Sequence, residues 1–254
     1  MRGRRIPLSR ARRLVIDFLY FATGIPTVPV QRRMHIQPAI DARAALTNRP
    51  AWTAIFVKAF ALVSAEVPEL RRAFLKLPWR HLHEYPEPVA SVAIERDLDG
   101  DKAVLVARVK DPASLSLPEL SRRVRSFAES PVDQIKDFRR ALRTSSYPRP
   151  LRRLLWWLGL NHPSQRIRYF GTFGVSVYSG LGAESLHPLA PLTTILNYGV
   201  FSPDGQVDVR VVYDHRVMDG AIVARALARL EEILAGPIVD ELRELAVVKA
   251  SRAA

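Results

Sequence analysis

The sequence predicts a single mixed α/β domain, and three observations support this fold class. Hydrophobic residues make up 48% of the 254 residues, an ordinary share for a globular protein, and this length can bury a sizeable core. Stretches with the two-residue period of strands alternate along the chain with stretches of helical period. No internal repeat or low-complexity linker divides the chain, so one domain over residues 1–254 is the economical interpretation.

The net charge of +13 is concentrated in two segments. Residues 1–33 contain eight arginines and one aspartate, a charge of +7, and residues 136–168 contain nine Lys or Arg and one aspartate, a charge of +8. The remaining residues therefore sum to −2. There is no cysteine, which excludes thiolate catalysis, disulfides and cysteine-ligated metals and is compatible with a cytoplasmic protein.

The first predicted helix covers about residues 8–22, within the basic N-terminal segment 1–33. Its arginine-rich start and apolar continuation resemble a signal peptide, but Asp17 interrupts the apolar run and no small-residue cleavage site precedes Pro26. No segment approaches the roughly 20 apolar residues that span a bilayer. We therefore expect an amphipathic helix that ends shortly before Pro26.

The next elements are predicted from period and from turn residues. Residues 34–41 are expected to form a strand in which Pro38 marks an edge or a bulge. Asp41 is expected to cap a short helix over residues 42–46. Residues 51–67 contain only two charges, which predicts a helix buried on nearly every side.

A hairpin and another helix follow. Two strand-like runs, residues 89–95 and 102–109, flank an Asp-Gly-Asp turn signal. Residues 114–129 return to helical spacing, with serines available as caps. His81 and His83 form a His-x-His pair, but no further ligands stand at a recognisable spacing, so we interpret them as loop histidines and predict no metal site.

Residues 136–168 form an unusual basic segment, in which 149–160 combines arginines with leucines and the adjacent Trp156 and Trp157. Three interpretations remain open. The Leu/Trp face packs on the body or on a neighbouring subunit, or it lies in a membrane interface or against a lipid-like substrate, or the segment contacts nucleic acid. Packing is favoured slightly over peripheral membrane contact, and nucleic acid comes last because no nucleic-acid-binding motif is present.

The chain is organised around the stretch Asp-His-Arg-Val-Met-Asp-Gly-Ala at residues 214–221. Residues 207–213 before it are β-branched and aromatic, which indicates a strand, and the residues after it have helical spacing. His215 is therefore expected on a turn between rigid elements, where an imidazole can act as a general base near neutral pH. Asp219 stands where a helix favours a carboxylate cap, and Gly220 lets the first turn pack closely.

A second informative stretch, Gly-Thr-Phe-Gly-Val-Ser-Val-Tyr-Ser-Gly-Leu-Gly, occupies residues 171–182 and has strand composition as far as Tyr178. Together the two stretches resemble the catalytic domain of the dihydrolipoamide acyltransferases of 2-oxoacid dehydrogenase complexes, with their His-x-x-x-Asp-Gly signature. The chloramphenicol acetyltransferases are more distantly similar. The resemblance covers about residues 9–237, most closely 171–235. It implies a chloramphenicol acetyltransferase-like α/β (α+β) fold with two layers and a mixed sheet.

The resemblance implies roles for individual residues. His215 would take a proton from the acceptor, and Ser176 would donate a hydrogen bond to the oxyanion of the tetrahedral intermediate. Asp219 would be structural, held by an arginine for which Arg12 and Arg13 are the candidates. The family's run has threonine where this chain has Gly174 and asparagine where it has Val177, which leaves the environment of the acyl group open.

The implied function is an acyltransferase that moves an acyl group between a coenzyme A thioester and a thiol, hydroxyl or amine acceptor. No cofactor would be permanently bound. Because the chain contains no lipoyl-bearing domain, a separate acyl carrier or another acceptor is expected. The alternative is a non-catalytic trimeric scaffold or a membrane-associated paralogue of the acyltransferase core.

The resemblance also implies an assembly and a location. Family members are trimers with active sites between subunits, so a homotrimer is expected, in the cytoplasm and with a peripheral membrane contact through 149–160 as the open alternative. The basic segment 136–168 is longer than its counterpart in the family. Residues 238–254 are expected to form a charged helical tail.

Overall fold

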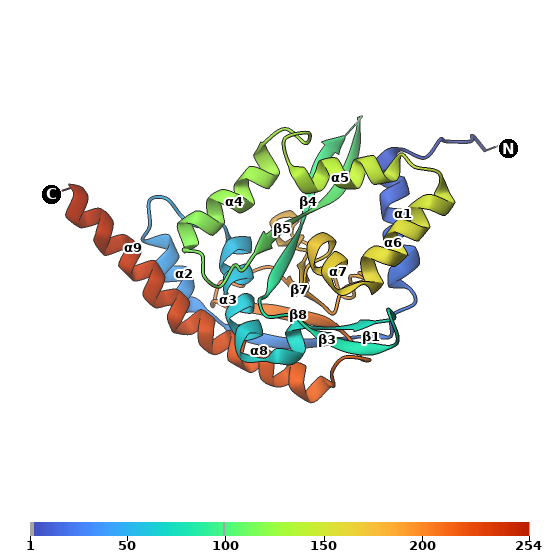
Figure 1. Cartoon of the computed structure of the whole chain (residues 1–254). Helices are drawn as coiled ribbons and strands as arrows, with labels where there is room; N and C mark the ends of the chain where they lie inside the picture. Colours follow the sequence, from blue (N-terminus) through green and yellow to red (C-terminus); the bar gives the residue numbers. More distant parts are fainter. Residues whose placement is uncertain (1–2, 99, 254) are drawn as a thin grey trace.

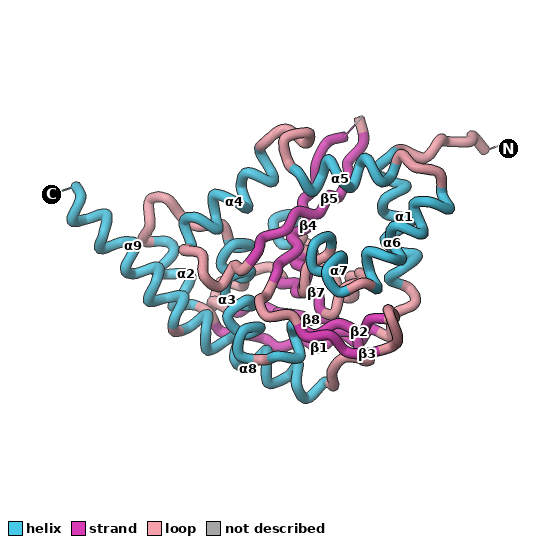
Figure 2. Tube along the Cα trace, viewed as in Figure 1, coloured by secondary structure: helices cyan, strands magenta, loops and turns pink. Residues whose placement is uncertain are grey.

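The computed structural model describes residues 3–98 and 100–253, with residues 248–253 as backbone only. Its centre is a six-stranded mixed sheet in the order β1-β8-β7-β6-β4-β5, which runs through the middle of the molecule (Figures 1 and 2). The strands are β1 (Thr27–His35), β4 (Val89–Leu98), β5 (Asp101–Lys110), β6 (Phe173–Val175), β7 (Thr194–Tyr198) and β8 (Gln206–Asp214). A separate two-stranded sheet pairs β2 (Arg72–Leu75) with β3 (His81–Glu84). The predicted mixed α/β fold class is confirmed.

One face of the sheet is covered by the main hydrophobic core. The helices on this face are α2 (Gln37–Ala44), α3 (Trp52–Glu66), α4 (Leu117–Glu129), α8 (Gly220–Ala235) and α9 (Pro237–Ala253). Ten of the 15 residues of α3 are buried, as its near-absence of charge predicts. Phe60 of α3 packs edge-on against Phe173 of β6, with ring centroids 4.9 Å apart, so α3 lies directly over the central strand.

The other face is covered by α1 (Arg10–Ala22), α5 (Lys136–Ser145), α6 (Arg149–Asn161) and α7 (Pro163–Tyr169), together with the loop before β7. In Figure 1, α1, α5 and α6 gather on the same side of the molecule although more than 100 residues separate α1 from α5 in sequence. Leu14 of α1 packs with Leu105 of β5 and Phe138 of α5. The basic segment 136–168 thus supplies three helices of this second layer.

A buried ion-pair cluster joins α1 to α6. The carboxylate of Asp17 is fully buried and accepts hydrogen bonds from Nε of Arg152 and, at 2.8 Å, from Nε of Arg153. Beside the cluster, the Trp156 ring stacks on Phe21 with centroids 6.0 Å apart. Asp17, which interrupts an apolar run in the sequence, is therefore the point at which helix α6 is attached to α1.

The structure supports the packing interpretation for one side of α6. Arg152 and Arg153 point toward the body, whereas interfacial binding would require them to flank an outer face toward headgroups. Trp156 and Trp157 are half-buried. Four leucines of the same helix remain exposed, namely Leu151, Leu154, Leu155 and Leu158. Within the described residues, no helix combines the length and the apolarity that crossing a membrane requires.

The prediction for residues 34–41 is wrong. Strand β1 ends at His35, and Pro38 lies in the first turn of α2, where its missing N–H removes no helical hydrogen bond. Asp41 does not cap a helix over 42–46; it lies inside α2 and accepts a hydrogen bond from Gln37 Nε2 at 2.7 Å. The apolar alternation in this stretch was read as a strand, whereas the proline marks the start of a helix.

Four other predictions are confirmed with small shifts. Helix α1 begins after Ser9, whose hydroxyl accepts a hydrogen bond from Arg12 N at 3.2 Å, and α4 begins after the capping Ser116. The hairpin runs longer than predicted, with ten residues in each of β4 and β5. Helix α9 covers the predicted tail 238–254 up to Ala253.

Candidate active site

The turn that carries His215 is anchored at both ends. Strand β8 ends at Asp214 and α8 begins at Gly220, as the sequence predicts. The buried carboxylate of Asp214 accepts hydrogen bonds from Arg216 N at 3.0 Å, Nε at 2.9 Å and Nη2 at 2.7 Å. The backbone N–H of His215 donates to the carbonyl of Pro26 at 3.0 Å. The imidazole therefore projects from a backbone that is held on two sides.

The His215 side chain is 47% exposed, so a substrate can reach it. Its Nδ1 lies 3.5 Å from Asp219 Oδ1, which is a long contact and becomes an ion pair when the imidazole is protonated. With Nδ1 toward this carboxylate, Nε2 is the nitrogen on the far side of the ring that can accept a proton. This geometry suits a general base.

Asp219 occupies the N-cap position of α8, but its side chain makes no capping hydrogen bond. The carboxylate is 80% exposed and faces His215 instead, which corrects the expected capping role. Tyr213 lies beneath the same turn, and burial, followed by the charge of Asp219, raises the pKa of its phenol. A Cβ on Gly220 would lie 3.2 Å from the Tyr213 hydroxyl oxygen, so glycine lets the first turn of α8 approach this buried ring.

Arg12 and Arg13 lie in α1, away from the His215 turn. Arg12 is exposed, whereas Arg13 is half-buried and its Nε is a buried nitrogen without a hydrogen-bond partner. In the described part of this single chain, neither arginine forms a hydrogen bond or an ion pair with Asp219. The structure therefore does not bring together the predicted arginine and aspartate within one copy.

Ser176 directly follows β6, where the chain leaves the sheet. Its N–H donates to the carbonyl of Leu196 at 3.2 Å, and its own carbonyl accepts from Asn197 Nδ2 at 2.5 Å. Asn197 is fully buried in β7, in which all five residues are buried. The sequence reasoning did not single out Asn197, although an amide inside an otherwise apolar strand is a signal of a specific hydrogen bond.

Ser176 and His215 lie toward opposite ends of β7. Ser176 is hydrogen-bonded to Asn197, whereas the N–H of Asp214, next to His215, donates to the carbonyl of Thr193 at 2.8 Å. Four residues of extended chain separate Thr193 from Asn197, about 13 Å at the strand rise of 3.3 Å per residue. One copy of the chain therefore does not place the two side chains in a common site.

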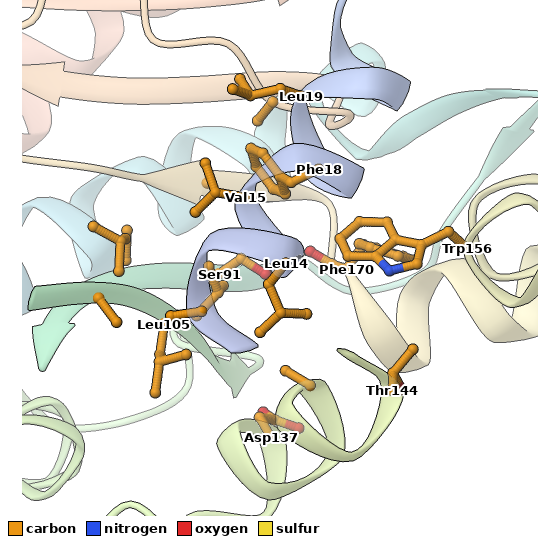
Figure 3. Close-up of a pocket in the computed structure, with 18 of the residues that line it drawn as sticks. Leu14, Val15, Phe18, Leu19, Ser91, Leu105, Asp137, Thr144, Trp156 and Phe170 are labelled. Atoms are coloured by element: carbon orange, nitrogen blue, oxygen red, sulfur yellow. Dashed lines mark hydrogen bonds between the residues drawn. The ribbon is translucent and has the colours of Figure 1, made fainter. Parts of the chain in front are cut away.

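A cavity of about 1540 Å³ lies on the second face of the sheet, between the strands and helices α1, α5 and α6 (Figure 3). Leu14, Val15 and Phe18 of α1 line it, and Trp156 and Phe170 lie side by side at another wall. Ser176 belongs to its lining, whereas His215 does not. Over residues 3–98 and 100–253, no three His, Asp or Glu side chains gather as metal ligands.

Comparisons with known proteins identify the fold. No protein-family model matches the chain, and no curated protein matches it in sequence. Among solved structures, the dihydrolipoamide acetyltransferase of Azotobacter vinelandii is 19% identical with a TM-score of 0.68, and the likeness covers 92% of each chain. A probable dihydrolipoamide acetyltransferase from Listeria monocytogenes is 16% identical with a TM-score of 0.65, over 94% of this chain and 95% of that one.

A third solved structure with a similar fold is an enzyme of another kind. A chloramphenicol acetyltransferase is 13% identical with a TM-score of 0.53, over 90% of this chain and 96% of that one. At identities this low, the likeness concerns the fold. The chain therefore has the chloramphenicol acetyltransferase-like fold, the fold of the catalytic cores of 2-oxoacid dehydrogenase complexes, as its two motifs predict.

Proposed function

We propose that this protein is an acyltransferase that moves an acyl group from a coenzyme A thioester to a thiol, hydroxyl or amine acceptor. The observation that carries this proposal is His215 on an anchored turn, with Asp219 four residues later, in a fold that acetyltransferases share. The Azotobacter structure was determined to investigate a serine, a histidine and an asparagine in that enzyme's catalytic mechanism. Its histidine and asparagine also stand four positions apart.

In the proposed reaction, Nε2 of His215 takes the proton of the acceptor as the acceptor attacks the thioester carbonyl. The carbonyl oxygen becomes an oxyanion, which accepts a hydrogen bond from the Ser176 hydroxyl. The tetrahedral intermediate then expels the coenzyme A thiolate, which takes the proton back from the imidazolium. Both substrates are bound together, so neither a covalent acyl-enzyme nor a permanently bound cofactor is needed.

The separation of Ser176 from His215 favours a site shared between copies of the chain. About 13 Å of strand lies between their ends of β7, so a hydroxyl from one subunit and an imidazole from another would form each site. Asp219 is 80% exposed and, among the described residues of this chain, pairs with no arginine, so an arginine of a neighbouring copy can reach its carboxylate. We propose a homotrimer on this basis.

A membrane-associated or scaffolding role is the second candidate function. Leu151, Leu154 and Leu158 are exposed on α6, in the segment with a charge of +8. An exposed apolar stripe beside arginines suits the surface of an anionic membrane. This role does not require the geometry at His215.

The test is a screen of acyl-coenzyme A thioesters that monitors thiol release with thiol, alcohol and amine acceptors. His215→Ala is expected to lower turnover at least about 100-fold, and Ser176→Ala by about 10². His35→Ala is the matched control and should leave turnover unchanged, because the exposed His35 pairs with Gln206 at the end of β8 farthest from the turn. A folded His215→Ala variant with near-parental turnover would refute the mechanism. Absence of thiol release with every thioester would favour the scaffold.

A further inference from the structure

We infer that the cavity beneath α1, α5 and α6 binds the hydrocarbon chain of a long acyl group, with Ser176 at the carbonyl end. This inference rests on the proposed acyltransferase function and names its substrate class. At about 1540 Å³ the cavity is larger than the roughly 300–1000 Å³ of an ordinary small-molecule pocket. An acetyl group, with a single methyl, would leave nearly all of this space empty.

From Ser176, the cavity extends across the sheet toward the edge strand β5. Gly174, two residues before Ser176, pairs with Ser91 of β4, and Leu105 of the edge strand β5 also lines the cavity. Two strand spacings separate β6 from β5, about 10 Å across the sheet. Because Leu105 lies opposite Ile94, three residues along β4 from Ser91, the cavity also extends about 10 Å along the strands. An extended alkyl chain fits this span.

Near Ser176, the side chain of Leu192 packs closely against the backbone of Gly174. A Cβ at position 174 would lie 2.9 Å from Cδ1 of Leu192, so any larger residue would displace the Leu192 side chain. The acyltransferase run that this stretch resembles has threonine at this position. This departure from the family's run lies in the cavity wall two residues before Ser176, and Leu192 fills the space that a larger residue at position 174 would take.

Two polar side chains in the cavity wall, Asp137 and Ser91, are already paired with the protein. The carboxylate of Asp137 accepts from the backbone N–H of Arg108 at 3.0 Å and from its Nη2 at 2.6 Å. The Ser91 hydroxyl donates to the carbonyl of Phe170 at 2.5 Å. With these groups satisfied, the surface offered to a ligand is dominated by apolar side chains such as Leu14 and Phe18. A hydrocarbon matches this surface, since it brings no polar group that needs a partner.

The helices beside the cavity come from the two basic segments of the chain. Helices α5 and α6 belong to residues 136–168, and the Asp17 cluster ties α6 to α1 across the top of the cavity. Trp156 presents its ring to the cavity and packs against Phe170, with centroids 5.1 Å apart. Helix α6 thus contributes Leu155, Trp156 and Leu158 to the wall of an apolar site.

The binding test uses palmitate that carries a nitroxide spin label on its chain, and it does not depend on catalysis. Quenching of Trp156 fluorescence should be saturable at micromolar palmitate, and Trp156→Phe should remove the quenched component. Ala141→Phe places a ring from α5 into the cavity and should weaken palmitate binding at least tenfold. Ala128→Phe makes the same change on the exposed side of α4 and should leave binding unchanged.

The second arm compares acetyl-, octanoyl- and palmitoyl-coenzyme A as donors. We expect kcat/KM to be at least tenfold higher for palmitoyl than for acetyl, and this ratio should fall at least tenfold in Ala141→Phe but not in Ala128→Phe. Gly174→Ala, which displaces Leu192 within the cavity wall, provides the same comparison should Ala141→Phe not fold.

The outcomes separate this inference from the proposed function. Saturable palmitate binding without turnover of any thioester would support the cavity inference and contradict the acyltransferase. Turnover of acetyl-coenzyme A without saturable palmitate binding would support the acyltransferase and overturn the cavity inference. A third pair of results would also overturn the cavity inference: the parent protein does not bind palmitate, and Ala141→Phe dissociates the oligomer. The cavity would then be filled by a neighbouring copy of the chain.

Discussion

Asn197 illustrates how a single buried amide can position a residue that carries chemistry. Its Nδ2 donates to the carbonyl of Ser176 at 2.5 Å, at the point where the chain leaves β6. The strand itself is only three residues long, so this hydrogen bond, together with that from the Ser176 N–H to Leu196, fixes the serine backbone where the strand ends. Removing the amide would leave a part-buried carbonyl without its donor.

We predict that Asn197→Ala lowers kcat about tenfold with little change in KM, because the Ser176 hydroxyl would no longer be held in place. Stability should fall by about 1–3 kcal/mol. Asn161→Ala is the matched control, since Asn161 is also buried and its Nδ2 donates to a backbone carbonyl, that of Trp157, at 2.8 Å. Denaturant unfolding measures the stability of the two variants, and steady-state kinetics measures their kcat and KM. Equal kcat losses in both variants would contradict a specific role for Asn197.

At the scale of single residues, the two sequence motifs predict which residues lie in the candidate site better than they predict which side chains contact one another. The turn position of His215 follows from the strand and helix periods on either side of it, which are local properties of the sequence. The side-chain direction of Asp219 does not follow from them, because the carboxylate has two choices, the helix N-terminus and the imidazole. Asn197 lacks any local signature beyond its polarity, since its partner lies 21 residues away.

At the scale of elements, the Asp17 cluster attaches helix α6 to helix α1. One fully buried carboxylate faces two arginines from α6, so a neutral replacement would leave two cations in a water-poor environment. We predict that Asp17→Asn lowers the free energy of unfolding by about 3 kcal/mol in chemical denaturation. Arg123→Ala, which removes an exposed i,i+4 pair with Glu119 on α4, should cost at most about 0.5 kcal/mol. Similar losses in the two variants would show that α6 does not depend on the cluster.

The aromatic contacts of α6 support a second prediction about this element. Trp156 packs against Phe18, Phe21 and Phe170, so Trp156→Ala should lower stability by about 2 kcal/mol, less than for a fully buried tryptophan. Leu154→Ala, at a side chain that is 52% exposed, should change stability by less than about 0.5 kcal/mol. Sedimentation with anionic liposomes tests whether the exposed leucines of α6 contact a membrane. Lost binding in Leu154→Ala with unchanged stability would support membrane contact through this stripe.

Elements with one strong local signal were predictable. The nearly uncharged α3 and the hairpin around its Asp-Gly-Asp turn follow from composition and turn chemistry. Residues 34–41 carried two conflicting signals, apolar alternation and a proline, and the proline at the start of a helix was decisive. The layer that α5, α6 and α7 build could not be predicted in outline, because it depends on Asp17 more than 130 residues away.

At the scale of the whole molecule, the two faces of the sheet have different characters. One face is covered by the main hydrophobic core, whereas the other carries the open-sided cavity beside α1, α5 and α6. The sequence shows which segments are apolar, but a cavity is defined by side chains from distant segments that fail to fill the space between them. The existence of the cavity was therefore beyond sequence reasoning, although the basic Leu/Trp segment that roofs it stood out.

The assembly prediction belongs to this scale. Light scattering should give the mass of three chains at micromolar concentration, since a site assembled from separate subunits needs a closed ring of copies. Turnover per chain should fall on dilution below the concentration at which the ring dissociates. A stable monomer with full turnover would contradict the shared site.

The placement of Ser176 and His215 toward opposite ends of β7 has a consequence for mixtures of inactive proteins. If each site takes its hydroxyl from one subunit and its imidazole from the next, a Ser176→Ala chain and a His215→Ala chain carry complementary defects. Random mixing into rings would make about one quarter of the sites intact at both positions. Two proteins that are each inactive would then regain roughly a quarter of the parental rate when unfolded and refolded together, and the rate would peak at an equal ratio of the two chains.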